Sequence, residues 1–302
     1  MKAQKHSMFS RQSTGDKAFD IINVILMCLV LIVILYPLWF VVIASVSDPL
    51  KVMSGEVLFW PQGVSLKAYN MVFRDPLIMS GYGNTLIYTC LGTTINLIMT
   101  VLAAYPLSRK DWVGRGFFMA VVMFTMFFSG GTIPTYLIMN DLGLVNTIWA
   151  IVLPGAVSVY NTIVMRTFFI NSIPIELQEA AQVDGCSNTR LLLQIVLPLS
   201  KPILAVMVLF YGVMHWNAFF GALIYLTDSS KYPLQLILRS ILIQNTASQD
   251  MLGEVDTIGN RAMLAETLKY ALIIVSTVPM MILYPFLQRF FEKGVMVGAV
   301  KG

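Results

Sequence analysis

Six stretches of this chain are long and almost entirely apolar, and they constrain its fold more than any other feature of the sequence. They cover residues 19–45, 84–107, 117–138, 147–169, 202–226 and 267–287. A helix needs about 20 apolar residues to cross the roughly 30 Å hydrocarbon core of a bilayer. Strands of a membrane barrel would instead form segments of about ten residues with alternating polarity, and this pattern is absent. The sequence therefore predicts an all-α integral membrane protein with six transmembrane helices.

Composition and charge support this prediction and indicate an orientation. Hydrophobic residues make up 57% of the 302 residues and charged residues only 12%, whereas about a quarter of a soluble domain is charged. With Arg166 and Lys269 left out because they lie within predicted spans, twelve Lys and Arg residues fall on one side of the membrane and six on the other. Cytoplasmic loops are enriched in Lys and Arg. We therefore expect a plasma (inner) membrane protein with both termini in the cytoplasm.

The spans divide the chain into a cytoplasmic arm over residues 1–16, a transmembrane domain over 17–288 and a cytoplasmic tail over 289–302. Aromatic residues in the external segment 46–82 favour folding back onto the membrane interface. The external segment 227–266 contains a predicted short amphipathic helix over 234–242. The third span carries the run Ser129-Gly130-Gly131-Thr132-Ile133-Pro134. This run is the best candidate for a broken helix that lines an aqueous path, although proline is also common in membrane helices without that role.

Several other functions receive no support from the sequence. Cys28, Cys90 and Cys186 form no CxxC or His/Cys cluster, so we expect neither a metal site nor a disulfide. No basic face with aromatic platforms suggests nucleic-acid binding. A channel would carry rows of charge or a filter loop in its spans, and an intramembrane hydrolase would need a nucleophile with a base or paired acids there. The spans hold one His, and their only acid is Asp20, so we predict no catalytic residue.

The cytoplasmic segment 171–202 between the fourth and fifth spans has the signals of a bent helical hairpin. Pro174 favours a helix start, and we expect this first helix over 175–183. Gly185 can adopt the left-handed conformation that ends many helices, and Ser187 is placed to cap a second helix that runs toward Pro198. The exposed acids Glu179 and Asp184 could pair with a partner's Lys or Arg. Spacing alone fits a docking surface and a solvated helix that caps the bundle equally well.

The same segment resembles the EAA loop of permease subunits in ABC importers. The resemblance lies in Glu179-Ala180-Ala181, Asp184-Gly185, Ile195 and Leu197-Pro198. The six spans and the terminal residues 289–302 resemble the carbohydrate-uptake branch, in particular the smaller of the two maltose permease subunits. Cys186 stands where the family usually has Ala, and Leu192 stands where an aromatic residue is common.

This resemblance implies a type I importer permease with a cytoplasmic coupling helix and a defined set of partners. A second, homologous permease, two ATPase subunits and an extracytoplasmic sugar-binding protein would complete the transporter. The coupling residues would be Glu179, Ala180, Ala181, Asp184, Gly185, Leu197 and Pro198. ATP and Mg²⁺ would belong to the ATPase partner, since the chain has no GxxxxGK[ST] motif, and we expect no cofactor or metal on the chain itself. The implied substrate is a sugar, in particular an oligosaccharide, with a polyol or glycerol phosphate as the alternative.

Polar and aromatic residues within spans are candidates for substrate contact, because polar groups are costly in a membrane. The candidates in the fifth span are Tyr211, His215, Trp216, Asn217 and Phe219, and those in the fourth are Tyr160 and Asn161. They could bind sugar hydroxyls or stack on a pyranose ring. Interhelical hydrogen bonds and ordinary packing explain the same residues. Arg166 lies one turn from the cytoplasmic end of the fourth span, where we expect it to snorkel or to pair with the EAA loop, and only a deeper position would let it bind a substrate carboxylate.

Overall fold

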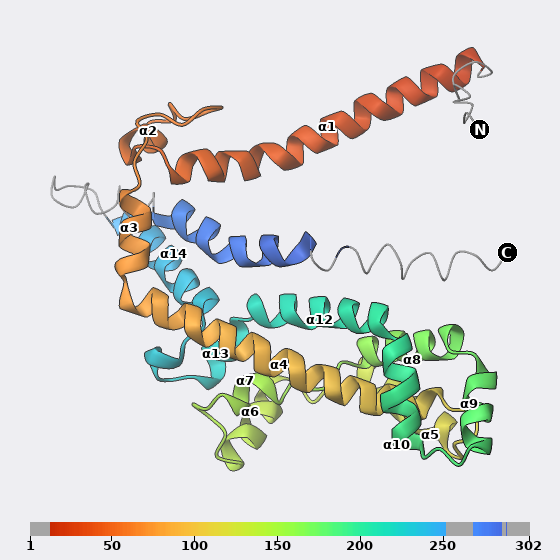
Figure 1. Cartoon of the computed structure of the whole chain (residues 1–302). Coiled ribbons are helices and arrows are strands. Elements are labelled where there is room, and N and C mark those ends of the chain that lie inside the picture. The colour runs from red at the N-terminus through yellow and green to blue at the C-terminus, as the bar shows by residue number, and fades with distance from the viewer. Residues whose placement is uncertain (1–12, 252–267, 286–287, 289–302) are drawn as a thin grey trace. The chain divides into compact units, whose positions relative to one another are not determined.

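The computed structural model describes residues 13–251, 268–285 and 288, with backbone alone for Thr14 and residues 244–251. All regular elements in this part of the chain are helices (Figure 1). The predicted tail over 289–302, most of the predicted arm over 1–16 and residues 252–267 of the last external segment lie outside the described residues.

The helices are short on average, and a few long ones organise the rest. Their order is α1 (Thr14–Ser45), α2 (Pro49–Met53), α3 (Lys67–Arg74), α4 (Pro76–Ser108), α5 (Arg115–Phe127), α6 (Thr132–Asp141), α7 (Trp149–Val152), α8 (Val159–Ser172), α9 (Ile175–Val183), α10 (Asn188–Leu191), the π-helix η1 (Leu192–Val196), α11 (Leu197–Leu199), α12 (Lys201–Trp216), α13 (Phe220–Tyr225), the 3₁₀-helix η2 (Ser229–Lys231) and α14 (Leu234–Met251). A further helix covers Leu268–Pro285.

The described residues form two compact units. The first comprises residues up to 70 and residues 268–274. In it, the segment after α1 folds back onto the end of that helix, and its predicted position at the membrane interface stays a prediction. The Trp39 indole N–H donates to the carbonyl of Phe59 (2.9 Å), Trp39 meets Trp60 edge to face, and the Tyr69 and Ser45 hydroxyls are hydrogen-bonded at 2.8 Å.

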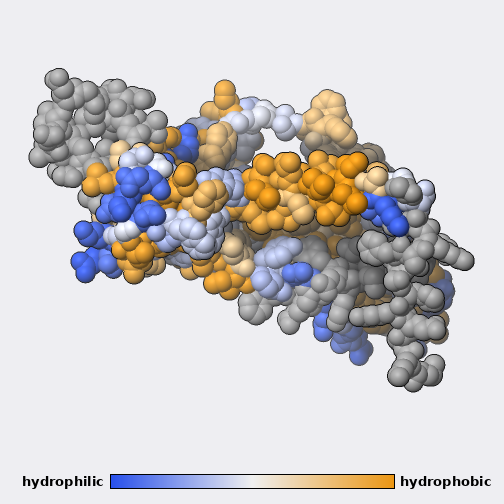
Figure 2. Space-filling view, turned by 90° about the horizontal axis from the view of Figure 1, so that it is seen from above, coloured by the Kyte–Doolittle hydropathy of each residue, from blue (hydrophilic) through white to orange (hydrophobic). Residues whose placement is uncertain are grey.

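Most of α1 is apolar on every side. Its most apolar stretch buries no residue within the structure; residues 21–39 are all exposed, and only the end of the helix, with Ile43 and Ala44, is buried. Apolar side chains also form extended orange areas on the face drawn in Figure 2. A helix that is hydrophobic all round is stable only when lipid or another protein surrounds it, so this surface fits a membrane environment.

The second unit comprises residues 71–251, 275–285 and 288, and α4 is its central helix. Both α8 and α12 pack along α4 (Figure 1). The α4–α12 contact is close because Gly92 has no side chain: a Cβ at this position would overlap the imidazole ring of His215. The core of this unit contains fully buried side chains from three segments, including Met165 on α8, Leu191 on α10 and Met207 on α12.

Three helices are long and apolar enough to cross a membrane: Gly15–Ser45, Pro76–Ser108 and Leu268–Pro285. Two bent pairs raise this number to five if each pair counts as one span: Arg115–Phe127 with Thr132–Asp141, bent by 110°, and Asn188–Leu199 with Lys201–Trp216, bent by 82°. The chain is thus a multi-helix membrane protein. Within the described residues, three of the six predicted spans are continuous helices.

The other predicted spans are interrupted where helix-breaking residues occur. The third span breaks over residues 128–131, at the Ser-Gly-Gly run, and Gly131 has a φ of +87°. The fourth was expected to be one helix over 147–169, but it divides into α7 and α8 around Pro154 and Gly155, and the Ser158 hydroxyl caps α8. The fifth ends its first helix at Trp216 and resumes at Phe220. The predicted helix over 234–242 is present but continues to Met251.

Candidate functional site

The hairpin predicted over residues 171–202 is present with the expected bounds. Helix α9 covers Ile175–Val183, and Gly185 has a φ of +70°. The N–H of Cys186 donates a hydrogen bond to the carbonyl of Ala181 (2.9 Å), which caps the C-terminal end of α9. The Ser187 hydroxyl then accepts from the N–H of Arg190 and caps α10. The local chemistry of glycine and serine therefore sets a sharp reversal between two helices.

Helix α9 has a buried side and an exposed side. Ala181 is 7% exposed and belongs to the core with Leu191 and Val196, whereas Glu179 and Ala180 on α9 are exposed. Val183 is 88% exposed. Asp184, Gly185 and Pro198 are also exposed, and Leu197 packs partly against the core. Most of the predicted coupling residues are thus accessible to another protein.

An arginine at the end of α4 fastens α9 to the rest of the unit. The Arg109 guanidinium donates to both carboxylate oxygens of Asp111 (2.9 and 2.8 Å) and to Oε1 of Gln178 on α9 (2.7 Å). One turn further along α9, the Gln182 amide donates to Asp111 (3.4 Å). We call these four residues the Arg109 clamp.

The clamp is electrostatically matched. Arg109 is 6% exposed, and its guanidinium lies 6.0 Å from the centre of the Tyr105 ring. The hydrogen bonds from Arg109 lower the pKa of the Asp111 carboxyl, and the same bonds raise the pKa of Arg109. A cleft of about 310 Å³ lies at this place, lined by the clamp residues with Lys110, Ile175 and Glu179. The cleft offers charges of both signs at the surface of α9.

Two further bonds join the same end of α4 to neighbouring helices. Tyr105 donates its hydroxyl to the carbonyl of Asn188 on α10 (3.4 Å). Arg166 on α8 donates to the carbonyl of Leu107 at the end of α4 (2.8 Å); its pairing with the EAA loop and its binding of a substrate carboxylate stay predictions. In the sequence, Arg109 serves only as one of the basic residues that assign the sides of the membrane. The only available signal for the clamp was the pair of glutamines at i and i+4 on α9.

Three of the five candidates in the fifth span are buried and bonded within the chain. His215 Nε2 is 2.6 Å from Asn96 Oδ1, and the Asn96 amide donates to the carbonyl of Gly155. The Tyr211 hydroxyl is 2.6 Å from that of Thr100, and the Trp216 indole N–H donates to the carbonyl of Ser276 (2.9 Å). These contacts give each side chain a structural role, and substrate contact by them stays a prediction.

The remaining candidates are divided between surface and interior. Asn217 is exposed, and its amide donates only to the carbonyl of Val213 (2.9 Å). Phe219 is 37% exposed, with the Arg239 guanidinium 5.5 Å from its ring centre. Tyr160 is 58% exposed, whereas its neighbour Asn161 is 7% exposed. The structure therefore does not gather the seven candidates into one site.

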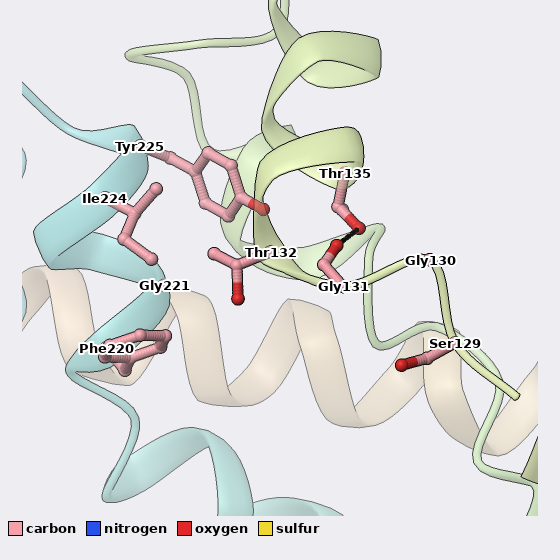
Figure 3. A pocket seen from close by; sticks show the side chains of 9 residues that line it. All are labelled: Ser129, Gly130, Gly131, Thr132, Thr135, Phe220, Gly221, Ile224 and Tyr225. Carbon is pink, nitrogen blue, oxygen red and sulfur yellow. Dashed lines mark hydrogen bonds between the residues drawn. The ribbon is translucent and has the colours of Figure 1, made fainter. Parts of the chain in front are cut away.

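A pocket that the sequence candidates did not include lies where the broken third span meets α13 (Figure 3). It has a volume of about 320 Å³. One side is lined by Ser129, Gly130, Gly131, Thr132 and Thr135, and the other by Phe220, Gly221, Ile224 and Tyr225 of α13. We call it the break pocket. The break is predictable from the Ser-Gly-Gly run, but its partner α13 lies about 90 residues later in the chain, and no sequence pattern connects the two.

Candidate ligands for a metal ion are scarce in the described part of the chain. No group of three or more His, Cys, Asp or Glu side chains there could hold an ion.

Comparisons with known proteins agree with this arrangement. Residues 5–297 match the family model described as "Binding-protein-dependent transport system inner membrane component". The chain is 37% identical to Protein LplC of Bacillus subtilis, with 99% of this chain and 100% of that protein covered. It is 38% identical to the B. subtilis polygalacturonan/rhamnogalacturonan transport system permease protein YtcP, with 95% and 99% covered.

A solved structure is also similar. It is a crystal structure of a bacterial ABC transporter involved in the import of the acidic polysaccharide alginate. The match has a TM-score of 0.84 and 33% identity, and it covers 93% of this chain and 99% of that chain. The chain therefore belongs to the family of binding-protein-dependent transport system inner membrane components: it is a permease subunit of an ABC importer, in which separate subunits hydrolyse ATP.

Proposed function

We propose that this chain is one of two permease subunits of an ATP-driven oligosaccharide importer and that α9 is the helix through which an ATPase subunit moves it. The transmembrane domain would cover residues 17–288 and cross the membrane six times, with both termini cytoplasmic. The second permease, two ATPase subunits and an extracytoplasmic binding protein would complete the assembly. ATP and Mg²⁺ would bind to the ATPase subunits.

The observation that carries the coupling role is the geometry of α9 and Gly185. The helix exposes Glu179 and Ala180 while its opposite side joins the core through Ala181. A force applied to the exposed side would therefore reach the packed helices directly. The clamp adds a second connection, because Arg109 follows α4 immediately and binds Gln178 on α9. Packed cores transmit such displacements because they have low compressibility.

The proposed substrate class follows from the similar proteins. YtcP is named for polygalacturonan and rhamnogalacturonan, and the solved transporter for the acidic polysaccharide alginate. Both names refer to polysaccharides, which are built from the same kind of sugar units as oligosaccharides. We therefore propose an oligosaccharide and include both acidic and neutral ones in the test.

Coupling can be tested in vesicles that contain the whole transporter, purified with its ATPase and binding protein. Glu179→Ala removes a charge from the exposed side of α9. Gly185→Pro demands a φ near −65° where the chain has +70°, so the hairpin cannot keep its shape. Both variants should abolish substrate-stimulated ATP hydrolysis while the complex still assembles. Glu56→Ala, which removes an exposed acid outside the segment 171–202, should behave as wild type. Full stimulation in either α9 variant would refute the coupling role.

A further inference from the structure

Two interrupted helices meet at the break pocket, and the break before α6 leaves backbone N–H groups without a side-chain cap. At the end of α5 the chain turns through 110° before α6 begins. Gly131 is the N-cap of α6 and has no side chain that could bond the free N–H groups of the first turn. In a membrane-spanning chain, such groups are tolerated only where they are buried in protein or line an aqueous cavity.

The strongest evidence for a ligand is Tyr225. Its side chain belongs to a residue that is only 7% exposed, and its hydroxyl points into the pocket (Figure 3). Within the described residues this hydroxyl has no hydrogen-bond partner, whereas other buried tyrosines such as Tyr211 and Tyr88 are bonded. The ring is held in place by stacking on Tyr136, with the planes 7° apart and the centres at 6.1 Å. The hydroxyl faces the open pocket and is therefore free to bond with water or with a ligand that enters it.

The other lining groups have a consistent chemistry. The Ser129 and Thr132 hydroxyls likewise make no side-chain hydrogen bond within the described residues, and Phe220 presents a ring that is 58% exposed. None of the lining residues is ionisable at neutral pH apart from the weakly acidic tyrosine. Hydroxyl donors and acceptors, free backbone N–H groups and aromatic faces match a polyhydroxylated ring. The lining offers no charged group for an ion and too many polar groups for a lipid chain.

We propose that the break pocket is a saccharide-binding site on this permease, in which Tyr225, Thr132 and Ser129 hydrogen-bond sugar hydroxyls and Phe220 packs on a pyranose ring. The volume of about 320 Å³ is at the lower end for small-molecule pockets, so the site holds part of an oligosaccharide. The site hydrogen-bonds hydroxyl groups and packs on ring faces, and it does not distinguish acidic sugars from neutral ones. This inference rests on the proposed function, because it assigns part of the sugar path to this chain.

Tyr225→Phe tests the site with little risk to the fold, because it removes one oxygen and keeps the stacked ring. In vesicles with the full transporter, uptake is measured with trigalacturonate and with maltotriose, and half-saturation is determined for whichever is transported. The concentration for half-maximal uptake should rise about fivefold, the effect of one lost neutral hydrogen bond, and maximal ATP hydrolysis should stay unchanged. Tyr284→Phe removes an exposed hydroxyl outside the pocket and is the matched control.

A labelling experiment gives a second, independent result. Thr132→Cys is introduced after Cys28, Cys90 and Cys186 are replaced, and the reaction of the new thiol with a hydrophilic methanethiosulfonate is followed. The transported saccharide should slow this reaction. If the thiol at position 132 is unreactive without saccharide, as when the second permease fills the pocket, the inference is overturned. Unchanged half-saturation in Tyr225→Phe would overturn it too. If the wild-type complex transports no saccharide at all, the proposed function itself fails.

Discussion

Removing the Arg109 side chain tests whether the clamp holds α9 in place for coupling. In Arg109→Ala, Asp111 loses both of its bonds to the guanidinium and Gln178 loses its charged donor. The backbone of α9 keeps its packing through Ala181. The variant should therefore fold and assemble, but with α9 detached from the end of α4 for a larger fraction of the time.

The size of the effect can be worked out from the contacts. The Asp111 side chain is 54% exposed, so solvent screening limits the ion pair to about 0.5–1 kcal/mol. The bond from the charged guanidinium to Gln178 adds about 1.5 kcal/mol, and the contact with the Tyr105 ring adds about 0.5 kcal/mol. The total of about 2.5–3 kcal/mol corresponds to about a 70- to 160-fold increase in the detached state.

Hydrogen exchange measured by mass spectrometry on the purified transporter would detect this change. Peptides that cover α9 should exchange faster in Arg109→Ala by about that factor, and those that cover the middle of α4 should not. Arg74→Ala, which removes an exposed arginine at the end of α3, controls for the loss of charge. A doubly swapped variant, Arg109→Asp with Asp111→Arg, should regain much of the protection, because glutamine amides can both donate and accept. Unchanged exchange of α9 in Arg109→Ala would refute the role of the clamp.

Three other perturbations have outcomes set by local geometry. Gly92→Ala should reduce the free energy of unfolding by about 1–3 kcal/mol, because the new Cβ overlaps the His215 ring. The loss should appear as a lower melting temperature of the detergent-solubilised protein. Gly83→Ala on the same helix is the control, because its Cβ meets nothing within 4 Å and should leave the melting temperature unchanged. His215→Leu should also lower the melting temperature, whereas Asn217→Leu should weaken uptake and leave the melting temperature unchanged. If both variants lowered the melting temperature equally, the distinction between a structural His215 and a substrate-facing Asn217 would be wrong. The lowered pKa of Asp111 means that its pairing stabilises the fold above the ordinary value of 3.8 and is lost as pH falls through the lower folded value. The protection factor of the α9 amides, in which the rise of the intrinsic exchange rate with pH is divided out, should thus be constant between about pH 5 and 8, and a change of the protection factor within that range would contradict the role of Asp111.

The parts of the structure that depend on local chemistry could be predicted from sequence. The bounds of α9 follow from Pro174, Gly185 and Ser187, each of which acts within a few residues of its own position. The break in the third span follows from Gly130 and Gly131 in the same way. The bend angles and the division of the fourth span around Pro154 could not be predicted, because prolines within membrane helices often cause no break.

Contacts between distant parts of the chain were beyond the reach of sequence patterns. His215 was a candidate for substrate contact because polar groups in spans are costly, but its hydrogen-bond partner Asn96 lies 119 residues earlier. Arg109 and Gln178 are separated by 69 residues. In the sequence, nothing distinguishes Tyr225 from other aromatic residues in apolar runs. Its position opposite the break in the third span is visible only in the folded chain. Only the tertiary structure brings these pairs together.

The most direct test of the central claim is a photo-crosslink from α9 to the ATPase subunit. Val183 is 88% exposed on this helix, so a photoreactive amino acid there should not disturb the core. In the assembled transporter, the account predicts a covalent product that contains this chain and the ATPase subunit. An assembled, ATP-hydrolysing complex in which position 183 crosslinks to no ATPase subunit would contradict it.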